Sequence, residues 1–159
     1  MKNIDIYTLI VASILVEAVC VVILFFTKRG GKNIKIWYAN YKIGAYVFDV
    51  LSLVIGSFIP IFITNNYLLQ IILVVIIGLI HDIIFGYFIV KNKPTKGISK
   101  VFFDYAKEMK TNILVVDSLM LISTIIAFNY LKVLDRHLLG FIGCLLAYIG
   151  LYIVYSFTV

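Results

Sequence analysis

The sequence predicts an all-α membrane protein: a polytopic bundle of five transmembrane helices that forms one integral membrane domain over residues 1–159. The composition is 63% hydrophobic and only 14% charged, whereas soluble domains are about half apolar and about a quarter charged. The apolar residues gather in five blocks of about 20 residues, the length of helix that crosses a bilayer of about 30 Å. Because these blocks lack the alternation of membrane β-strands, helices are the structure that satisfies their backbone in lipid. A soluble globular protein is excluded.

The first two spans are predicted at residues 7–27 and 43–63. The N-terminal run resembles a signal peptide, but Glu17 interrupts it and no A-x-A cleavage site follows, so we expect a retained first span. Pro60 lies inside the second span, where it removes one backbone hydrogen bond near the outer end of the helix. Both blocks therefore predict helices that cross the membrane.

Three further spans are predicted at residues 68–90, 113–131 and 138–158. The TNNY connection at residues 64–67 is so short that the second and third spans must form a tight antiparallel hairpin. A short helix that lies at the membrane surface is expected over residues 98–109, ISKVFFDYAKEM. The chain thus has four spans plus a C-terminal fifth, with an interfacial helix in the third loop.

Lysine and arginine are concentrated in two alternate loops, which hold 11 of the 14 such residues. By the positive-inside rule these loops face the cytoplasm, which places the N-terminus outside and the C-terminus in the cytoplasm. A bilayer also accounts for the formal net charge of +6, so nucleic acid is not an expected partner. Trp37 and Tyr38 are expected at the headgroup level. The expected partner is lipid with anionic headgroups, contacted by the basic loop residues Lys28, Arg29, Lys32, Lys35, Lys91, Lys93, Lys96 and Lys100.

Each of the first four spans contains one carboxyl group, namely Glu17, Asp49, Asp82 and Asp117. A central acid costs about 2.5–3.5 kcal/mol even on the insertion scale, so these side chains need partners, protonation or water. At about 1.5 Å per residue, the three aspartates fall at similar depths in the half of the membrane nearest the basic loops. We therefore expect these acids to face the bundle interior and to form a buried polar layer with His81.

Several accounts of this polar layer are open. In a functional account, the acids exchange protons or bind a cation, and the protein conducts or couples transport. In a structural account, the acids are interhelical hydrogen-bond partners that fix helix packing. Their partners would then be backbone carbonyls and the hydroxyl groups of Ser52, Ser118 and Thr124.

A third account involves two lysines that lie two helical turns from an acid. Lys42 precedes Asp49 by seven residues, and Lys110 precedes Asp117 by the same spacing. Each lysine lies on the same helix face as its acid, so the lysine can reach inward while the carboxylate leans outward to meet it. Two of the four acids would then be neutralised without any transport.

Catalytic chemistry is not expected. His81 and Asp82 are adjacent, and neighbouring helical residues point about 100° apart, so we do not expect a self-contained pair. A metal site would need more histidines than His81 and His137. The sequence contains no nucleophile elbow, Walker loop, H-E-x-x-H or glycine fingerprint. It therefore predicts a protein that is not an enzyme and has no cofactor or metal.

Small residues form stripes that allow helices to approach closely. Gly56 lies on the acidic stripe of the second span, and Gly78 and Gly86 flank Asp82 in the third, so we expect an interhelical seam there. The last span carries a further stripe, which either seals the bundle or forms a homo-oligomer contact. Its members are Gly140, Gly143, Ala147 and Gly150.

The second and fourth spans share the spacing K-x6-D-x-L-x-L, which runs from Lys42 to Asp49 and from Lys110 to Asp117. This spacing suggests a duplicated hairpin, in which spans one and two correspond to spans three and four in parallel orientation. The alternative is that apolar helices share leucine and isoleucine through composition alone.

Three strings, at residues 81–85 (HDIIF), 104–108 (DYAKE) and 116–120 (VDSLM), resemble an uncharacterised family of multi-span membrane proteins encoded by nucleocytoplasmic large DNA viruses. The resemblance covers the third and fourth spans and the loop between them. It implies residence in a virion internal membrane or in a membrane of the infected host cell. The resemblance implies no activity and assigns no role to the acids.

Two functions are consistent with these features. The first is a structural or assembly component of a membrane, in which the acids fix helix packing and the basic loops contact anionic lipid or an inner protein layer. The alternative is a small proton- or cation-coupled channel or transporter that uses the same intramembrane acids.

Overall fold

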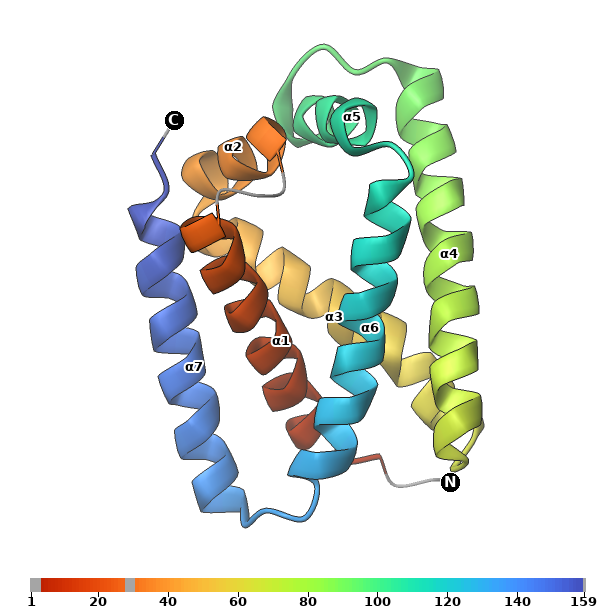
Figure 1. Cartoon of the computed structure of the whole chain (residues 1–159), viewed down its shortest axis with the longest axis vertical. Coiled ribbons are helices and arrows are strands. Elements are labelled where there is room, and N and C mark those ends of the chain that lie inside the picture. Colours follow the sequence, from red (N-terminus) through yellow and green to blue (C-terminus); the bar gives the residue numbers. More distant parts are fainter. Residues whose placement is uncertain (1–3, 28–30, 159) are drawn as a thin grey trace.

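The computed structural model describes residues 4–27 and 31–158, and within them the regular elements are α-helices (Figure 1). Five of these helices are long and apolar enough to cross a membrane, and their ends lie within two residues of the predicted spans. The predicted all-α bundle of five spans is therefore confirmed. The helices are α1 (Ile6–Thr27), α2 (Gly31–Tyr41), α3 (Ile43–Ile63), α4 (Tyr67–Asn92), α5 (Gly97–Met109), α6 (Asn112–Leu131) and α7 (Arg136–Ser156).

The two short helices, α2 and α5, lie side by side across one end of the bundle, and we refer to this pair as the interfacial platform (Figure 1). α5 confirms the short helix predicted over residues 98–109. The sequence prediction missed α2, because the loop between the first two spans was interpreted only as a positively charged segment. Its apolar residues recur at helical spacing, with Ile34, Trp37, Tyr38 and Tyr41 at i, i+3, i+4 and i+7.

The predicted hairpin between the second and third spans is present as α3 and α4, which pack against each other. The carbonyl oxygen of the Asn66 side chain accepts a hydrogen bond from the Leu69 amide at 3.1 Å and so caps the N-terminus of α4. The Gln70 side-chain amide donates to the Thr64 carbonyl at 2.8 Å. These contacts satisfy backbone groups that the tight turn leaves without helical partners.

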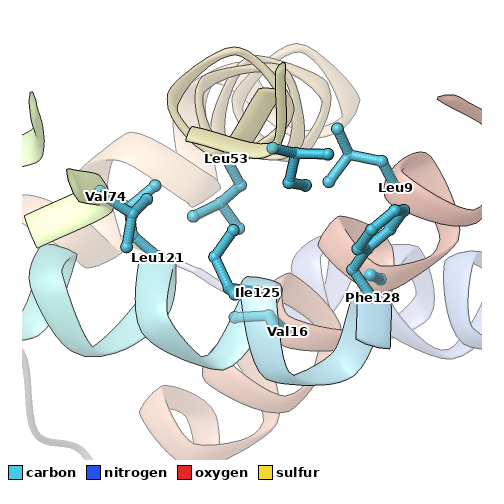
Figure 2. Packing of buried hydrophobic residues seen from close by; sticks show 9 residues of the cluster. Leu9, Val16, Leu53, Val74, Leu121, Ile125 and Phe128 are labelled. Atoms are coloured by element: carbon cyan, nitrogen blue, oxygen red, sulfur yellow. The ribbon is translucent and has the colours of Figure 1, made fainter. Parts of the chain in front are cut away.

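An apolar core, drawn close up in Figure 2, packs among α1, α3, α4 and α6 in the half of the bundle opposite the interfacial platform (Figure 1). It draws on the first half of α1 and of α4 and on the second half of α3 and of α6, because these segments meet at that end. Its buried members are Leu9, Ala12, Val16, Leu53, Ile61, Val74, Leu121, Ile125 and Phe128. This core is the main hydrophobic contact among the four helices.

The expected seam between α3 and α4 exists, and a side chain of α6 fills it. A Cβ atom added at Gly56 would lie 2.8 Å from Leu121 Cδ2, and one added at Gly78 would lie 2.6 Å from Leu121 Cδ1. Leu121 therefore occupies a niche that only two glycines leave open. Gly86 has no neighbouring atom within 4 Å of a Cβ at that position, so its expected role in packing is wrong.

The glycine stripe of α7 packs inside the chain. A Cβ at Gly143 would lie 3.0 Å from Val11 of α1, and one at Gly150 would lie 2.5 Å from the hydroxyl oxygen of Tyr46 of α3. Gly140 lies against the Tyr7 hydroxyl in the same way, and Ala147 is half-buried. Of the two alternatives for this stripe, the structure thus supports sealing of the bundle.

The structure extends the internal repeat from two helices to three, since α1–α2–α3 and α4–α5–α6 follow the same order. Both short helices begin at a glycine with positive φ, 83° at Gly31 and 73° at Gly97. Both are followed by a lysine in one unusual conformation, with φ 48° and ψ −122° at Lys42 and φ 51° and ψ −128° at Lys110. α1 and α4 run in the same direction, as parallel repeats require (Figure 1). α7 packs mainly on the first repeat.

Candidate functional site

The four intramembrane acids come together directly beneath the interfacial platform. Glu17 of α1 is completely buried, and the side chain of Asp82 of α4 is 14% exposed. Asp49 of α3 and Asp117 of α6 are half-buried. Asp117 lies close enough to Asp82 and Asp49 for their charges to interact. Glu17 is likewise close enough to Asp49 and Asp117 for an electrostatic interaction. We refer to these four residues as the acidic layer.

His81 does not belong to this layer. Its side chain is 68% exposed, so it lies on the outer surface of the bundle. The expectation that His81 and Asp82 cannot pair is also wrong, since His81 Nδ1 lies 3.0 Å from Asp82 Oδ1. Side-chain torsions close the angle that the helical projection leaves between neighbours. The imidazole ring also stacks on Phe85, with ring planes 6° apart.

Two aromatic side chains of α2 connect the platform to the acids. The Tyr38 hydroxyl oxygen lies 2.6 Å from Glu17 Oε1 and 2.9 Å from Asp49 Oδ2. The Trp37 indole N–H donates to the same Asp49 oxygen at 2.9 Å. Both aromatic side chains are 3% exposed. Sequence reasoning placed these rings at the headgroup level and missed their role as partners of the acids.

The second repeat has no comparable set of hydrogen bonds. Asp82 Oδ2 is buried and has no partner in the described part of the chain. Tyr105 of α5 lies near the acids, and burial together with the charges of Asp117 and Asp49 raises the pKa of its phenol. Burial and the charges of Glu17 and Asp49 likewise raise the pKa of Tyr38. Both phenols therefore keep their protons, and Tyr38 donates to the acids.

The account in which Lys42 neutralises Asp49 is wrong. The Lys42 ammonium group donates to the Phe157 carbonyl oxygen at 2.7 Å and lies 5.8 Å from the centre of the Tyr155 ring. The Phe157 ring in turn stacks on the Tyr38 ring, with the two ring centroids 5.5 Å apart. Over residues 4–27 and 31–158, the ion pairs are His81–Asp82 and Lys100–Asp104, and neither contains Lys110.

Two of the three hydroxyl groups expected to bind the acids, Ser52 and Thr124, have other partners. Ser52 Oγ donates to the backbone carbonyl oxygen of Asp49 at 2.8 Å, and Thr124 Oγ1 donates to the Met120 carbonyl at 2.9 Å. Such bonds to the preceding turn are common for hydroxyl side chains inside helices. The structural account of the acidic layer therefore stands on Tyr38 and Trp37 and not on Ser52 or Thr124.

Glu108 fastens the two helices of the platform to each other. Its carboxylate, on α5, accepts hydrogen bonds from the backbone amides of Lys32 at 2.6 Å and Asn33 at 2.8 Å, and from the Asn33 side chain at 2.9 Å. The two amides belong to the first turn of α2, which has no helical acceptors for them. These amides lower the pKa of the Glu108 carboxyl group.

We expect Glu108→Gln to loosen the first turn of α2 and to make the stability of that turn depend less on pH. Because the folded pKa is lowered, the carboxylate stabilises the fold above its unfolded pKa of about 4.3, and this contribution is lost as pH falls through the folded pKa. The site is exposed, so the effect is ~0.5–1 kcal/mol. Amide exchange at Lys32 and Asn33, relative to intrinsic rates, measures it. Asp104→Asn is the matched control on α5, and equal protection in parent and Glu108→Gln would contradict this role.

The basic residues surround the platform. Lys32, Lys91, Lys93 and Lys96 are exposed, whereas Lys35 and Lys100 are half-buried. Two of the predicted lipid-contacting residues, at positions 28 and 29, lie outside the described residues. Lys107 is a further exposed lysine of α5, and its ammonium group lies 4.2 Å from the centre of the Phe103 ring. The platform thus combines buried aromatic anchors with exposed positive charge.

Within the described ranges, no three histidine, cysteine, aspartate or glutamate side chains are arranged to hold a metal ion. Comparison of the chain with protein-family models, curated proteins and solved structures finds no match. The functional argument therefore depends on the geometry of the acidic layer and of the interfacial platform.

Proposed function

We propose that this protein is a structural or assembly component of a membrane, and that its interfacial platform binds anionic lipid headgroups. One observation carries the proposal: hydrogen bonds hold the platform to the spans while lysines in and beside it stay exposed. Glu108 joins α2 to α5, and Tyr38 and Trp37 join α2 to the spans. Lysines fixed at a membrane surface attract anionic lipid by about 1 kcal/mol each.

The position of the acids favours this function over conduction. The acidic layer lies at the platform end of the bundle. Among the described buried side chains, the other end has no carboxyl group and consists of the apolar core with hydroxyl and amide groups such as Thr8, Ser57 and Gln70. Proton and ion pathways in membranes are marked by chains of acidic or histidine side chains, and no such chain continues from the layer into this end among the described residues. Two of the acids, Glu17 and Asp49, instead bind Tyr38 and Trp37, which hold the platform in place as a structural role requires.

The location in the cell is also part of the proposal. A cytoplasmic platform, with the N-terminus outside, follows from the positive-inside rule. A virion internal membrane or an infected-cell membrane follows from the resemblance of the strings at residues 81–85, 104–108 and 116–120 to viral membrane proteins. Both the orientation and the viral setting are inferences from sequence.

We expect the triple variant Lys93→Gln, Lys96→Gln, Lys107→Gln to bind phosphatidylserine ~100-fold more weakly, at about 1 kcal/mol for each lysine. Binding of phosphatidylcholine should not change. Titration of the purified protein with each lipid, followed by native mass spectrometry, measures both. Lys132→Gln is the matched control, because this exposed lysine follows α6 at the opposite end of the bundle. Equal affinity of the parent for the two lipids would contradict the proposal and leave an inner protein layer as the partner to test.

A second candidate function, proton- or cation-coupled transport, is favoured by two buried carboxyl oxygens, Glu17 Oε2 and Asp82 Oδ2, that have no hydrogen-bond partner among the residues the structure describes. Burying such an oxygen without a partner costs free energy unless it binds a proton, a cation or water. A proteoliposome flux assay across pH tests transport, with Asp49→Asn, Asp82→Asn and Asp117→Asn as variants. Flux in the parent that disappears in the variants would replace the structural proposal.

A further inference from the structure

The hydrogen bonds around Tyr38 need one more hydrogen than the ionised side chains contain. The Tyr38 hydroxyl has a single hydrogen, yet its oxygen lies within hydrogen-bond distance of both Glu17 Oε1 and Asp49 Oδ2, at 2.6 Å and 2.9 Å. It can donate fully to one of these oxygens. The other contact is a normal hydrogen bond only if that carboxyl group is protonated and donates to Tyr38.

The surroundings decide which carboxyl group carries the proton. Asp49 Oδ2 also accepts the Trp37 indole N–H at 2.9 Å, so the fixed donors of α2 converge on Asp49. Two donors stabilise an ionised carboxylate. Glu17 is completely buried, and its Oε2 has no partner among the described residues. A buried oxygen without a donor costs much less on a neutral acid than on a carboxylate.

We propose that Glu17 is a binding site for a proton, in which the Glu17 acid donates to Tyr38 and Tyr38 donates to the Asp49 carboxylate. Binding takes one proton from water on the platform side and changes the charge of the three residues from −2 to −1. Release returns the proton and leaves two carboxylates competing for one hydroxyl hydrogen, which weakens the attachment of α2. This inference goes beyond the proposed function and does not depend on lipid binding.

The groups that face Glu17 favour retention of the proton. α3 contributes Asp49 and Tyr46, and the Tyr46 hydroxyl donates to the Ile14 carbonyl at 3.4 Å. α6 contributes the charge of Asp117. α1 itself contributes the Cys20 thiol, which lies in the field of Glu17. The nearby end of α7 contributes the Phe157 ring, whose carbonyl engages Lys42. No lysine or arginine of the described segments forms an ion pair with Glu17.

Infrared spectroscopy tests the site without a mutation, because the sequence contains only two glutamates, Glu17 and Glu108. The parent protein, labelled with ¹³C at its glutamate carboxyl groups, is reconstituted in lipid vesicles at about pH 7, well above the ordinary glutamate pKa of about 4.3. We expect the shifted carbonyl band of a protonated carboxylic acid. Glu108, bonded to three N–H groups, contributes only carboxylate bands.

Variants assign the band. It should disappear in Glu17→Gln, stay in Glu108→Gln, and move to higher frequency in Tyr38→Phe, because the acid then loses its hydrogen-bond acceptor. Absence of the band from the labelled parent would overturn the proposal, whatever the variants do. A band that persists in Glu17→Gln would assign the proton to Glu108 and overturn it equally. Neither result bears on lipid binding by the platform, so the two proposals fail separately.

Discussion

Replacing Asp49 by alanine is expected to detach α2 from the bundle while the five spans stay folded. The substitution removes the acceptor of the Trp37 indole N–H and of the Tyr38 hydroxyl, both of which are buried. The Tyr38 hydroxyl keeps Glu17 Oε1 as a partner, whereas the indole N–H left without an acceptor costs about 1–3 kcal/mol, so α2 should lose about 1–3 kcal/mol of docking energy. A helix of 11 residues is only marginally stable without tertiary contacts, so a loss of this size is expected to release α2 from the bundle.

Two measurements follow this detachment. Trp37 is the only tryptophan in the chain, so its emission should shift to longer wavelength as the indole leaves its buried site. Amide exchange in α2 should accelerate by at least ~5-fold, the equivalent of about 1 kcal/mol. Asp49→Asn is the matched variant, because its side-chain carbonyl can still accept the indole hydrogen. Unchanged emission in Asp49→Ala would show that this carboxylate does not hold α2.

Leu121→Ala is expected to destabilise the bundle by ~2–5 kcal/mol, the usual cost of emptying a leucine site in a packed core. Leu121 is 7% exposed and fills the niche that Gly56 and Gly78 leave between α3 and α4. The backbones cannot close this gap easily, since three helices define it. Unfolding of the protein in mixed micelles, followed by circular dichroism, measures the change.

A double-mutant cycle separates this niche from general loss of apolar volume. Gly78→Ala should destabilise the parent, because the new Cβ would lie 2.6 Å from Leu121 Cδ1. The same change should cost little in the Leu121→Ala background, where that atom is absent. Gly86→Ala is the control on the same helix, because its site is open. Additive effects of Gly78→Ala and Leu121→Ala would contradict the packing described here.

The spans could be predicted from sequence because the bilayer fixes their length and hydropathy. Side-chain partners could not, and the reasons are local. The pairing of Lys42 with Asp49 assumed that the lysine continues the helix of α3, but its φ of 48° places it in the turn before that helix. Its side chain therefore leaves the Asp49 face and reaches the end of α7. The same turn conformation at Lys110 separates that lysine from the face of Asp117.

The acidic layer itself was predictable, because a carboxyl group in an apolar helix must face the interior. Its partners were not, since Tyr38 and Trp37 reach the acids only when α2 folds back over the bundle end. Recognition of α2 required the helical spacing from Ile34 to Tyr41, which was obscured by three nearby lysines and an arginine. His81 was misplaced because its polarity suggested the interior, although its side chain lies on the outer face of α4.

The contact between Glu17 and Tyr38 is the most direct test of the whole arrangement, because it joins a span to the platform through the acidic layer. Solid-state NMR in lipid, on protein labelled with ¹³C at the glutamate carboxyl and tyrosine ring carbons, should show a through-space correlation between these two residues. It should disappear in Glu17→Gln and in Tyr38→Phe. Two results would contradict convergence of the acids beneath the platform. One is a parent spectrum that lacks the correlation, and the other is a correlation that persists in either variant.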